Sequence, residues 1–322
     1  MIRLQPRRRT LPSRRAGVRA AQPPYPNMQT QPSKREFLDP AVLARLSRLE
    51  LTARGPMEGN IAGRHKSPHR GSSVEFAEYR KYVPGDDPRF LDWRVLARSD
   101  RYYLREFEAD TNLRCYLVLD ASGSMAFGDK FGYARKMAAT LGYLAMKQGD
   151  AVGLTCCGET LVKDIPPRRK PAHLRNLFDA MEATLPAGRT GLVKCLHDLA
   201  GKIRRRALVC VFSDLLDDPE QLLQCFRHLR FRKHDLAVFH LMDRAEIDFK
   251  FDRPVRFVDM ETNESVVAEP TMIYPKYRAT LDAYLERLRT GCLEFKVDYQ
   301  RVLTESKYDQ VLADFLLARV RK

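Results

Sequence analysis

The stretch RCYLVLDASGSM, residues 114–125, indicates most directly how this chain folds. An apolar run from Cys115 to Leu119 leads straight into Asp120, and Ser122 and Ser124 follow at alternate positions. A continuous apolar run of this length is typical of a strand that is buried on both faces, as in a parallel sheet. We therefore expect a central strand that ends at Asp120, with two serine hydroxyls in the loop beyond it.

Strands and helices alternate through the remainder of residues 113–322. Apolar runs of strand length lie at 150–158, 207–214 and 234–243, and segments with helical spacing separate them. This alternation predicts an α/β fold in which a doubly wound, mostly parallel sheet is flanked by helices. Short strands around the turn ETNES (261–265) should form a hairpin or extend the sheet, and a long helix, a strand or loop, and a closing helix should follow.

Two further oxygen-bearing residues are expected near Asp120, because doubly wound sheets bind ligands beyond the carboxyl ends of their strands. Asp214 ends the run ALVCVFSD, and Thr190 lies in the glycine-flanked loop LPAGRTGL. Two carboxylates and three hydroxyls, without histidine or cysteine, are ligands for a hard cation such as Mg²⁺, with Mn²⁺ or Ca²⁺ as alternatives. Since hydroxyls are neutral, such a cation would still attract a carboxylate from outside. The predicted metal ligands are Asp120, Ser122, Ser124, Thr190 and Asp214.

A structural role is the alternative interpretation of this motif. Aspartate and serine side chains commonly accept hydrogen bonds from the free N–H groups at the start of a helix. In that case Asp120, Ser122 and Ser124 would only cap the helix that follows them. We favour the metal site because Asp214 and Thr190 occur in the loops where it needs them.

Residues 36–112 form a segment of a different character. The leucine spacing predicts an amphipathic helix within 37–51, and the glycines and prolines of 54–73 predict a loop. Asp87 and Pro88 suit a helix start, so we expect a short helix from about Pro88 to Ala97. Charges of both signs surround Trp93, and such mixtures usually dock a segment onto its neighbour through ion pairs, or else face a partner.

The first 35 residues form a basic tail. They contain nine arginine and lysine residues and no acidic residue, in a chain whose net charge is +15. Their proline, glutamine and arginine content without hydrophobic periodicity predicts disorder. The tail can be interpreted as a solvated extension, a polyanion-binding arm or a transit peptide, or translation starts at Met28. We favour the first or the last, and expect no nucleic-acid binding, because no aromatic interleaving or nucleic-acid motif accompanies the charge.

The seven cysteines are expected to be reduced and buried. They are odd in number, form no C-x-x-C pair and mostly lie in apolar runs, as is usual for small hydrophobic residues of a cytosolic protein. Cys156 and Cys157 are adjacent, so on a strand they should point to opposite faces. No apolar run approaches the length of about 18 to 20 residues that spans a bilayer, so we do not expect membrane insertion.

The motif Asp120-Ala-Ser122-Gly-Ser124 resembles the D-x-S-x-S of von Willebrand factor A domains, whose metal-ion-dependent adhesion site adds a threonine and a second aspartate. The upstream stretch GRHKSPHRGSSVEFAEYRKYVPGDDPRFLDWRVLAR (63–98) is similar to the signature of the bacterial family known as domain of unknown function 58. The resemblance runs from about Arg64 to the C-terminus. Arg189 departs from the pattern, since a glycine is more usual just before the threonine.

Composition and pattern divide the chain into a tail at 1–35, a segment at 36–112 and a domain at 113–322. The resemblance implies that the second is the N-terminal segment of the family, docked on the rest, and that the third is a von Willebrand factor A-like domain. It also implies a partner among the MoxR-type AAA+ ATPases and a chaperone-like role in assembling other proteins. Many members carry transmembrane helices near the N-terminus, and their absence here favours a cytoplasmic form.

Enzyme motifs are missing from the sequence. No G-x-S-x-G surrounds the serines, and no phosphate-binding G-x-x-x-x-G-K-[ST] is present. We therefore expect a metal-dependent adaptor that binds an acidic group on a partner and catalyses no reaction. The alternatives are a metal-dependent enzyme acting on phosphate esters and a polyanion-binding protein that uses the tail.

Overall fold

The computed structural model describes residues 2–5, 37–49, 51–52, 74–81, 83, 92–99, 101–109, 113–249, 251, 253–262 and 264–320. The predicted loop at 54–73 lies outside these residues, and so does all of the tail after Gln5.

A six-stranded sheet forms the centre of the molecule, in the order β11-β8-β7-β4-β5-β6. Neighbouring strands are parallel except at the edge, where β6 runs antiparallel to β5. The strands are β4 (Arg114–Asp120), β5 (Ala151–Cys157), β6 (Leu161–Arg168), β7 (Leu208–Ser213), β8 (Asp235–Met242) and β11 (Asp298–Leu303). The predicted doubly wound α/β fold is confirmed.

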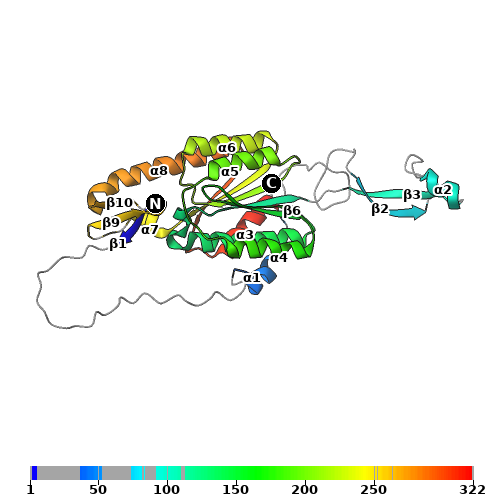
Figure 1. The fold of residues 1–322 in the computed structure, drawn as a ribbon, viewed down its shortest axis with the longest axis horizontal. Helices are drawn as coiled ribbons and strands as arrows, with labels where there is room; N and C mark the ends of the chain where they lie inside the picture. Colours follow the sequence, from blue (N-terminus) through cyan, green and yellow to red (C-terminus); the bar gives the residue numbers. More distant parts are fainter. Residues whose placement is uncertain are drawn as a thin grey trace, which may run out of the picture.

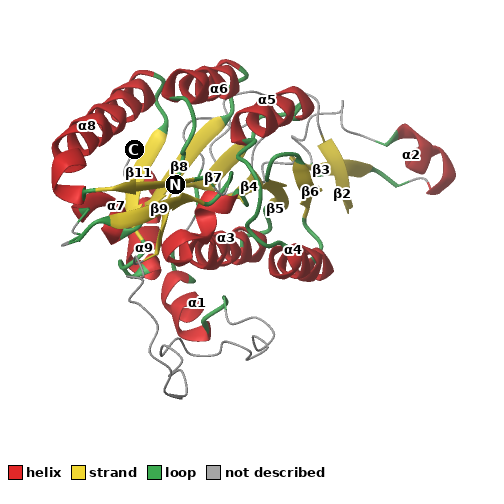
Figure 2. Ribbon diagram, turned by 60° about the vertical axis from the view of Figure 1, so that its left-hand side comes forward, coloured by secondary structure: helices red, strands yellow, loops and turns green. Residues whose placement is uncertain are grey.

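Helices cover both faces of this sheet (Figures 1 and 2). One face packs against α3 (Lys130–Lys147), α4 (Pro171–Ala183) and α9 (Tyr308–Val320), and the other against α5 (Leu192–Lys202), α6 (Pro219–Phe231) and α8 (Pro270–Glu294). Alternate residues of β4 serve the two layers, since Leu117 and Leu119 lie in the first core and Val118 in the second. As predicted, α9 packs on the sheet, with Phe315 and Leu316 buried.

The segment before the sheet divides into two parts. Helix α1 (Pro40–Leu46) begins with an Asp39 cap and buries Val42 and Leu46 in the first core, so docking is confirmed for this helix. Strands β2 (Val74–Lys81) and β3 (Tyr103–Ala109) pair as an antiparallel hairpin. Together with α2 (Trp93–Ser99) this hairpin lies beyond the β6 edge and apart from the helices that flank the sheet (Figure 1).

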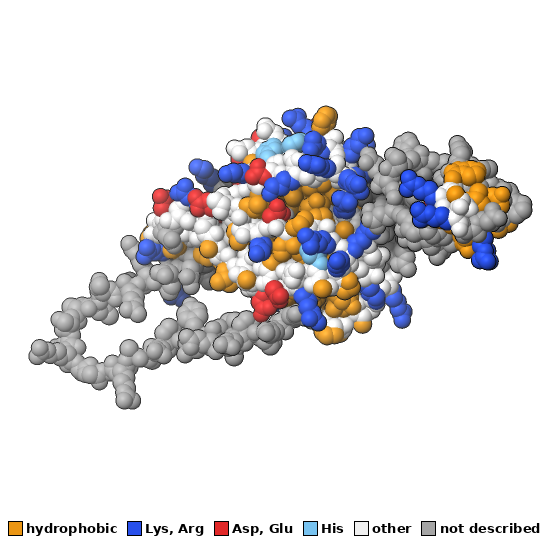
Figure 3. Space-filling view, turned by 45° about the vertical axis from the view of Figure 1, so that its right-hand side comes forward, with side chains coloured by type: hydrophobic (Ala, Val, Ile, Leu, Met, Phe, Trp, Pro, Cys, Tyr) orange, Lys and Arg blue, Asp and Glu red, His pale blue; other side chains and the backbone are white. Residues whose placement is uncertain are grey.

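Helix α2 overlaps the predicted helix of about 88–97 and is capped by Asp92, whereas the predicted start at Asp87 and Pro88 lies outside the described residues. The Asp92 carboxylate accepts hydrogen bonds from the N–H groups of Arg94, at 2.9 Å, and Val95, at 3.2 Å. Trp93, in the first turn, is 61% exposed, and Tyr102 is 56% exposed. Hydrophobic and basic side chains both reach the surface of this projecting part (Figure 3).

A second, smaller sheet lies beside helix α7 (Arg244–Asp248). Strands β9 (Val255–Asp259) and β10 (Ser265–Ala268) form the predicted hairpin, but they do not extend the central sheet. Their third strand is β1 (Ile2–Gln5), which is antiparallel to β9. The prediction of a disordered tail is therefore wrong for residues 2–5, because the open edge of β9 offers backbone hydrogen-bonding groups to a third strand. Among the residues described, no helix is long and apolar enough to cross a membrane.

Candidate functional site

Asp120 and Asp214 meet at the carboxyl edge of the central sheet. Asp120 is the last residue of β4, and Asp214 follows the last residue of β7, the parallel neighbour of β4. Both side chains are buried, with residue exposures of 1% and 2%. The topology therefore brings together two carboxylates that lie far apart in the sequence.

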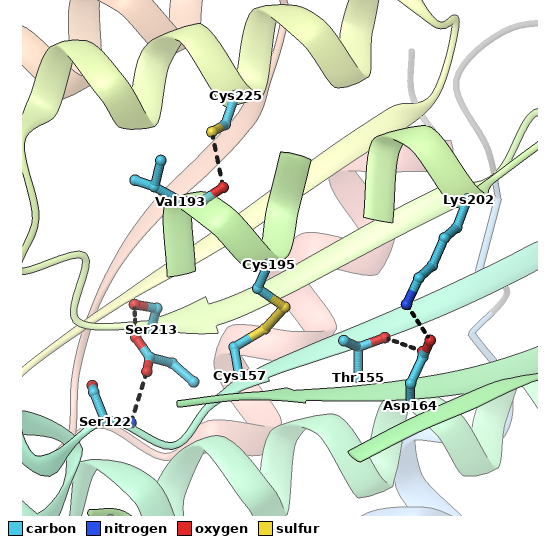
Figure 4. The surroundings of a disulfide bond; sticks show 10 residues. Ser122, Thr155, Cys157, Asp164, Val193, Cys195, Lys202, Ser213 and Cys225 are labelled. Atoms are coloured by element: carbon cyan, nitrogen blue, oxygen red, sulfur yellow. Dashed lines mark hydrogen bonds and ion pairs between the residues drawn. A yellow bond between two sulfur atoms is a disulfide. The ribbon is translucent and has the colours of Figure 1, made fainter. Parts of the chain in front are cut away.

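Asp120 is held by two hydrogen bonds. The Ser122 N–H donates to Oδ1 at 2.9 Å, and the Ser213 hydroxyl donates to Oδ2 at 2.5 Å. Figure 4 shows Ser122 and Ser213 around this carboxylate. Burial and the nearby Asp214 carboxylate raise the pKa of Asp120 to about 6, although the hydrogen bonds act in the opposite direction. The negative charge on Asp120 is thus poorly stabilised by the protein alone.

Ser122 and Ser124 present their hydroxyls to each other. Their Oγ atoms are 3.0 Å apart, and both residues are fully buried. Ser124 lies in the 3-10 turn η2 (Gly123–Asp129), and Ser122 takes its cap position without a side-chain capping bond. This geometry does not support the capping alternative for Ser122, and it leaves oxygen atoms of both hydroxyls near Asp120.

The loop that carries Thr190 packs directly against the serine loop. The Gly123 N–H donates to the Gly188 carbonyl at 2.8 Å, and the Ala187 N–H donates to the Ala121 carbonyl at 3.0 Å. Thr190 is therefore near the other predicted residues. Its N–H donates to Oε2 of Glu261, at 3.2 Å.

Three charged residues at this site were not predicted from the sequence. Lys130, the first residue of α3, is completely buried, and its Nζ lies 2.5 Å from Oδ2 of Asp214 and 2.8 Å from Oε1 of Glu246. Burial lowers the pKa of Lys130, but the two carboxylates outweigh that effect and leave the pKa raised. The third residue is Glu261, in the turn between β9 and β10. Glu246 completes the capping box that begins with Asp243 at the start of α7, a local signal that the sequence analysis did not use, whereas the partners of Lys130 and Glu261 are distant in the sequence.

The residues around this crevice carry an excess of negative charge that a divalent cation would balance. Asp214 and Glu246 both pair with the Lys130 ammonium, and Asp120 lies close enough to Asp214 for the two carboxylates to repel each other, so the carboxylates outnumber the one ammonium. Within the described part of the chain, no group of three or more histidine, cysteine, aspartate or glutamate side chains forms a metal site. The donor set near Asp120 is instead dominated by neutral hydroxyls, which suit a hard cation. The residues present thus fit the predicted ion.

An apolar pocket of about 470 Å³ lies next to these charges. Phe127 and Leu216, which follow the serine loop and Asp214, line it together with Glu246. Its other walls come mainly from aromatic and aliphatic residues of α8 and β9 and from the residue that follows α7, namely Phe249, Phe257, Ile273, Tyr277, Leu281 and Tyr284. The Tyr277 hydroxyl donates to the Glu246 carbonyl at 2.6 Å, so this polar group in the wall is already hydrogen-bonded.

The prediction that all cysteines are reduced is wrong for two of them. Cys157, at the end of β5, and Cys195, in α5, form a disulfide (Figure 4). The other five cysteines are free and buried. Cys156 and Cys157 do point into opposite cores, as predicted, and this orientation turns Cys157 toward α5. The pairing was missed because 38 positions separate the two residues and no spacing rule joins them.

The sequence profile of the family described as "Protein of unknown function DUF58" matches residues 78–285. The uncharacterized protein Rv1480 of Mycobacterium tuberculosis (strain ATCC 25618 / H37Rv) is 29% identical over 248 residues, which make up 74% of this chain and 76% of that protein. The uncharacterized protein YeaD of Bacillus subtilis (strain 168) is 29% identical over 171 residues, covering 52% of this chain and 41% of that protein.

Solved structures with a similar course of the chain include BatB from Bacteroides thetaiotaomicron, with a TM-score of 0.46, 11% identity and coverage of 66% of this chain and all of that one. A von Willebrand factor type A protein from Catenulispora acidiphila has a TM-score of 0.37 and 13% identity, and the match covers 66% of this chain and 43% of that one. These scores are low, so the fold assignment rests on the sheet described above.

The profile match spans well over half of the chain, and it includes Asp120, both serines, Thr190 and Asp214. It also includes β8 and the β9–β10 hairpin that surround the site. The chain therefore belongs to the DUF58 family.

Proposed function

We propose that this protein is a cation-dependent protein-interaction module that binds a carboxylate on a partner. The observation that carries the proposal is the meeting of Asp120, Asp214 and the paired hydroxyls of Ser122 and Ser124 at the carboxyl edge of the sheet. Likeness of the D-x-S-x-S motif to the adhesion site of von Willebrand factor A domains supports the same interpretation.

Each residue has a distinct role in this proposal. Ser122, Ser124 and Thr190 would hold Mg²⁺, or Mn²⁺ or Ca²⁺, through neutral oxygens, while Asp120 and Asp214 supply negative charge close by. A bound divalent cation supplies a positive centre to which an outside carboxylate is attracted. Lys130 holds Asp214 in place and offsets part of its charge, since the two groups are 2.5 Å apart.

We propose binding rather than catalysis for this site. The Ser122 and Ser124 hydroxyls hydrogen-bond with each other, and among the residues described neither has a histidine partner that would act as a base. Asp120 is occupied by two hydrogen bonds from Ser122 and Ser213, which suits a fixed charge better than a group that exchanges protons with a substrate.

The proposed partner is a MoxR-type AAA+ ATPase, as the family resemblance implies, and the pair would assemble or mature client proteins in the cytoplasm. The projecting part formed by α2 and the β2–β3 hairpin supports a second contact with a partner, because Trp93 of α2 and Tyr102, just before β3, are more than half exposed. Aromatic side chains are enriched at protein interfaces.

The test is affinity capture from native lysate with the full chain as bait, in Mg²⁺ and in EDTA. The wild type should retain an ATPase in Mg²⁺ and lose it in EDTA, and Asp120→Ala should lose it in both. A matched control is Asp198→Ala, because Asp198 is exposed on α5. Capture of the same proteins by every variant in both buffers would contradict the proposal.

A further inference from the structure

The turn between β9 and β10 covers the serine loop of the candidate site. A Cβ atom added to Gly123, which lies between Ser122 and Ser124, would be 2.6 Å from the Met260 carbonyl oxygen. The backbone of this turn thus touches the site with no room for a side chain between them. Glu261, the next residue, contacts the loop of Thr190, one of the five predicted ligands.

The Glu261 side chain is held against the Thr190 loop. Its Oε2 accepts the Thr190 N–H at 3.2 Å. The Asp259 carboxylate accepts the Glu261 N–H at 2.8 Å, and this bond fixes the turn. Glu261 is therefore positioned from both its backbone and its side chain.

The second carboxylate oxygen of Glu261 is unusual. Oε1 is buried and has no hydrogen-bond partner among the described residues. A buried oxygen of an ionised group is costly unless it is paired. A cation bound beside Oε1 of Glu261 would lower the free energy of the folded chain.

We propose that Glu261 is an internal carboxylate ligand of the candidate cation site, and that it takes the place that an acidic partner must enter. This inference rests on the proposed function. The three observations that carry it are the Thr190 contact, the unpaired oxygen and the close packing of the turn on Gly123. The first and the third involve the loops that hold the predicted ligands.

Two consequences follow for the cation and for the partner. Glu261 adds a charged oxygen to a donor set that is otherwise rich in neutral hydroxyls, so it strengthens cation binding. It also competes with an outside carboxylate, because a tethered group has a high effective concentration at its own site. In the isolated chain, Glu261 thus occupies the position of the partner carboxylate at the cation site, and a partner binds by displacing Glu261.

The test uses isothermal titration of the full chain with Mn²⁺, and then with the capped peptide acetyl-Gly-Glu-Gly-amide in saturating Mn²⁺. The variant is Glu261→Gln, whose amide oxygen can still accept the Thr190 N–H. Glu264→Gln is the matched control, since Glu264 is an exposed residue of the same turn. Asp120→Asn reports on the site as a whole. Circular dichroism verifies that each variant is folded.

Glu261→Gln should weaken Mn²⁺ binding about tenfold and strengthen peptide binding about tenfold, whereas Glu264→Gln should match the wild type. If Asp120→Asn loses Mn²⁺ but Glu261→Gln behaves as the wild type in both titrations, the role of Glu261 is wrong and the cation site stands. If Asp120→Asn binds Mn²⁺ as the wild type does, or if no chain binds it, both the proposed function and this inference are wrong.

Discussion

The Nζ of Lys130 lies 2.5 Å from Oδ2 of Asp214, and the lysine side chain is completely buried. This ion pair joins the start of α3 to the end of β7, and Glu246 of α7 completes it at 2.8 Å. A buried ion pair contributes little net stability relative to a well-packed apolar pair, but the loss of one partner is costly. The main role of the ion pair is therefore to fix the position of Asp214 in the site, and its contribution to stability is secondary.

Replacing Lys130 should destabilise the fold strongly. Lys130→Met leaves the carboxylates of Asp214 and Glu246 buried without their cation, at an expected cost of about 3–5 kcal/mol. Urea unfolding followed by circular dichroism measures the loss. Lys147→Met, at the exposed end of the same helix, should change stability by less than about 0.5 kcal/mol. Equal effects of the two substitutions would show that the buried pair is not as described.

Gly123→Ala should separate the β9–β10 turn from the serine loop. The new Cβ would meet the carbonyl oxygens of Met260 at 2.6 Å and Gly188 at 3.0 Å, both of which are backbone atoms. The expected cost is about 1–3 kcal/mol. Gly201→Ala is the control, because its Cβ meets no atom within 4 Å and alanine favours helix. Urea unfolding should show a lower midpoint for Gly123→Ala only, and a wild-type midpoint would refute the tight packing.

His234 should make stability depend on pH. Burial lowers its pKa to about 4, with the positive charges of Arg232 and Arg206 and the ring of His228 acting in the same direction. Neither ring nitrogen has a hydrogen-bond partner among the residues that the structure describes. The unfolded chain, with a histidine pKa of about 6.5, binds a proton that the folded chain does not bind. The contribution of neutral His234 to the free energy of unfolding is therefore complete above this pH and decreases toward pH 4.

The size of this effect should be roughly 2–3 kcal/mol between about pH 7 and pH 4. It is measured as the pH dependence of the unfolding free energy in the wild type and in His234→Gln, which should be flatter by that amount. His197→Gln, on an exposed helical position, should keep the wild-type slope. If the slopes of wild type and His234→Gln agree, His234 is not buried in its neutral form.

The disulfide can be tested by counting thiols. In protein purified without reductant and then denatured, alkylation should label five cysteines, and after reduction it should label all seven. A double Cys157→Ser, Cys195→Ser variant should lose about 2–4 kcal/mol of stability, since the bond closes a loop of 38 residues. Labelling of seven cysteines before reduction would show that the two thiols are free.

The central sheet could be predicted from the sequence because its strands are continuous apolar runs. Residues 115–119 lie in a strand that packs against both helical layers, and such a strand needs apolar side chains on both faces. The continuous apolar run therefore indicated a parallel strand from the sequence alone. The edge strand β6 was missed for the opposite reason: LVKDIPPR contains two prolines and charged residues, and most of its side chains are exposed. An edge strand needs no apolar face.

The candidate site was predictable where its residues follow strands. Asp120 and Asp214 end apolar runs, and parallel strands bring their carboxyl ends to one edge. Lys130 could not be predicted, since Asp214 and Glu246 lie 84 and 116 positions away and a lysine at a helix start usually faces water. Glu261 was missed because it lies in a turn of the smaller sheet, whose position over the site depends on tertiary packing.

The most direct test of the account is a calorimetric titration of Mg²⁺ into the full chain, comparing wild type, Asp120→Asn and the surface control Asp198→Asn. The account predicts one binding site per chain in the wild type and in Asp198→Asn, and no binding in Asp120→Asn. Equal binding by all three chains, or binding by none, would contradict the claim that Asp120, the two serines, Thr190 and Asp214 form a cation-centred recognition site.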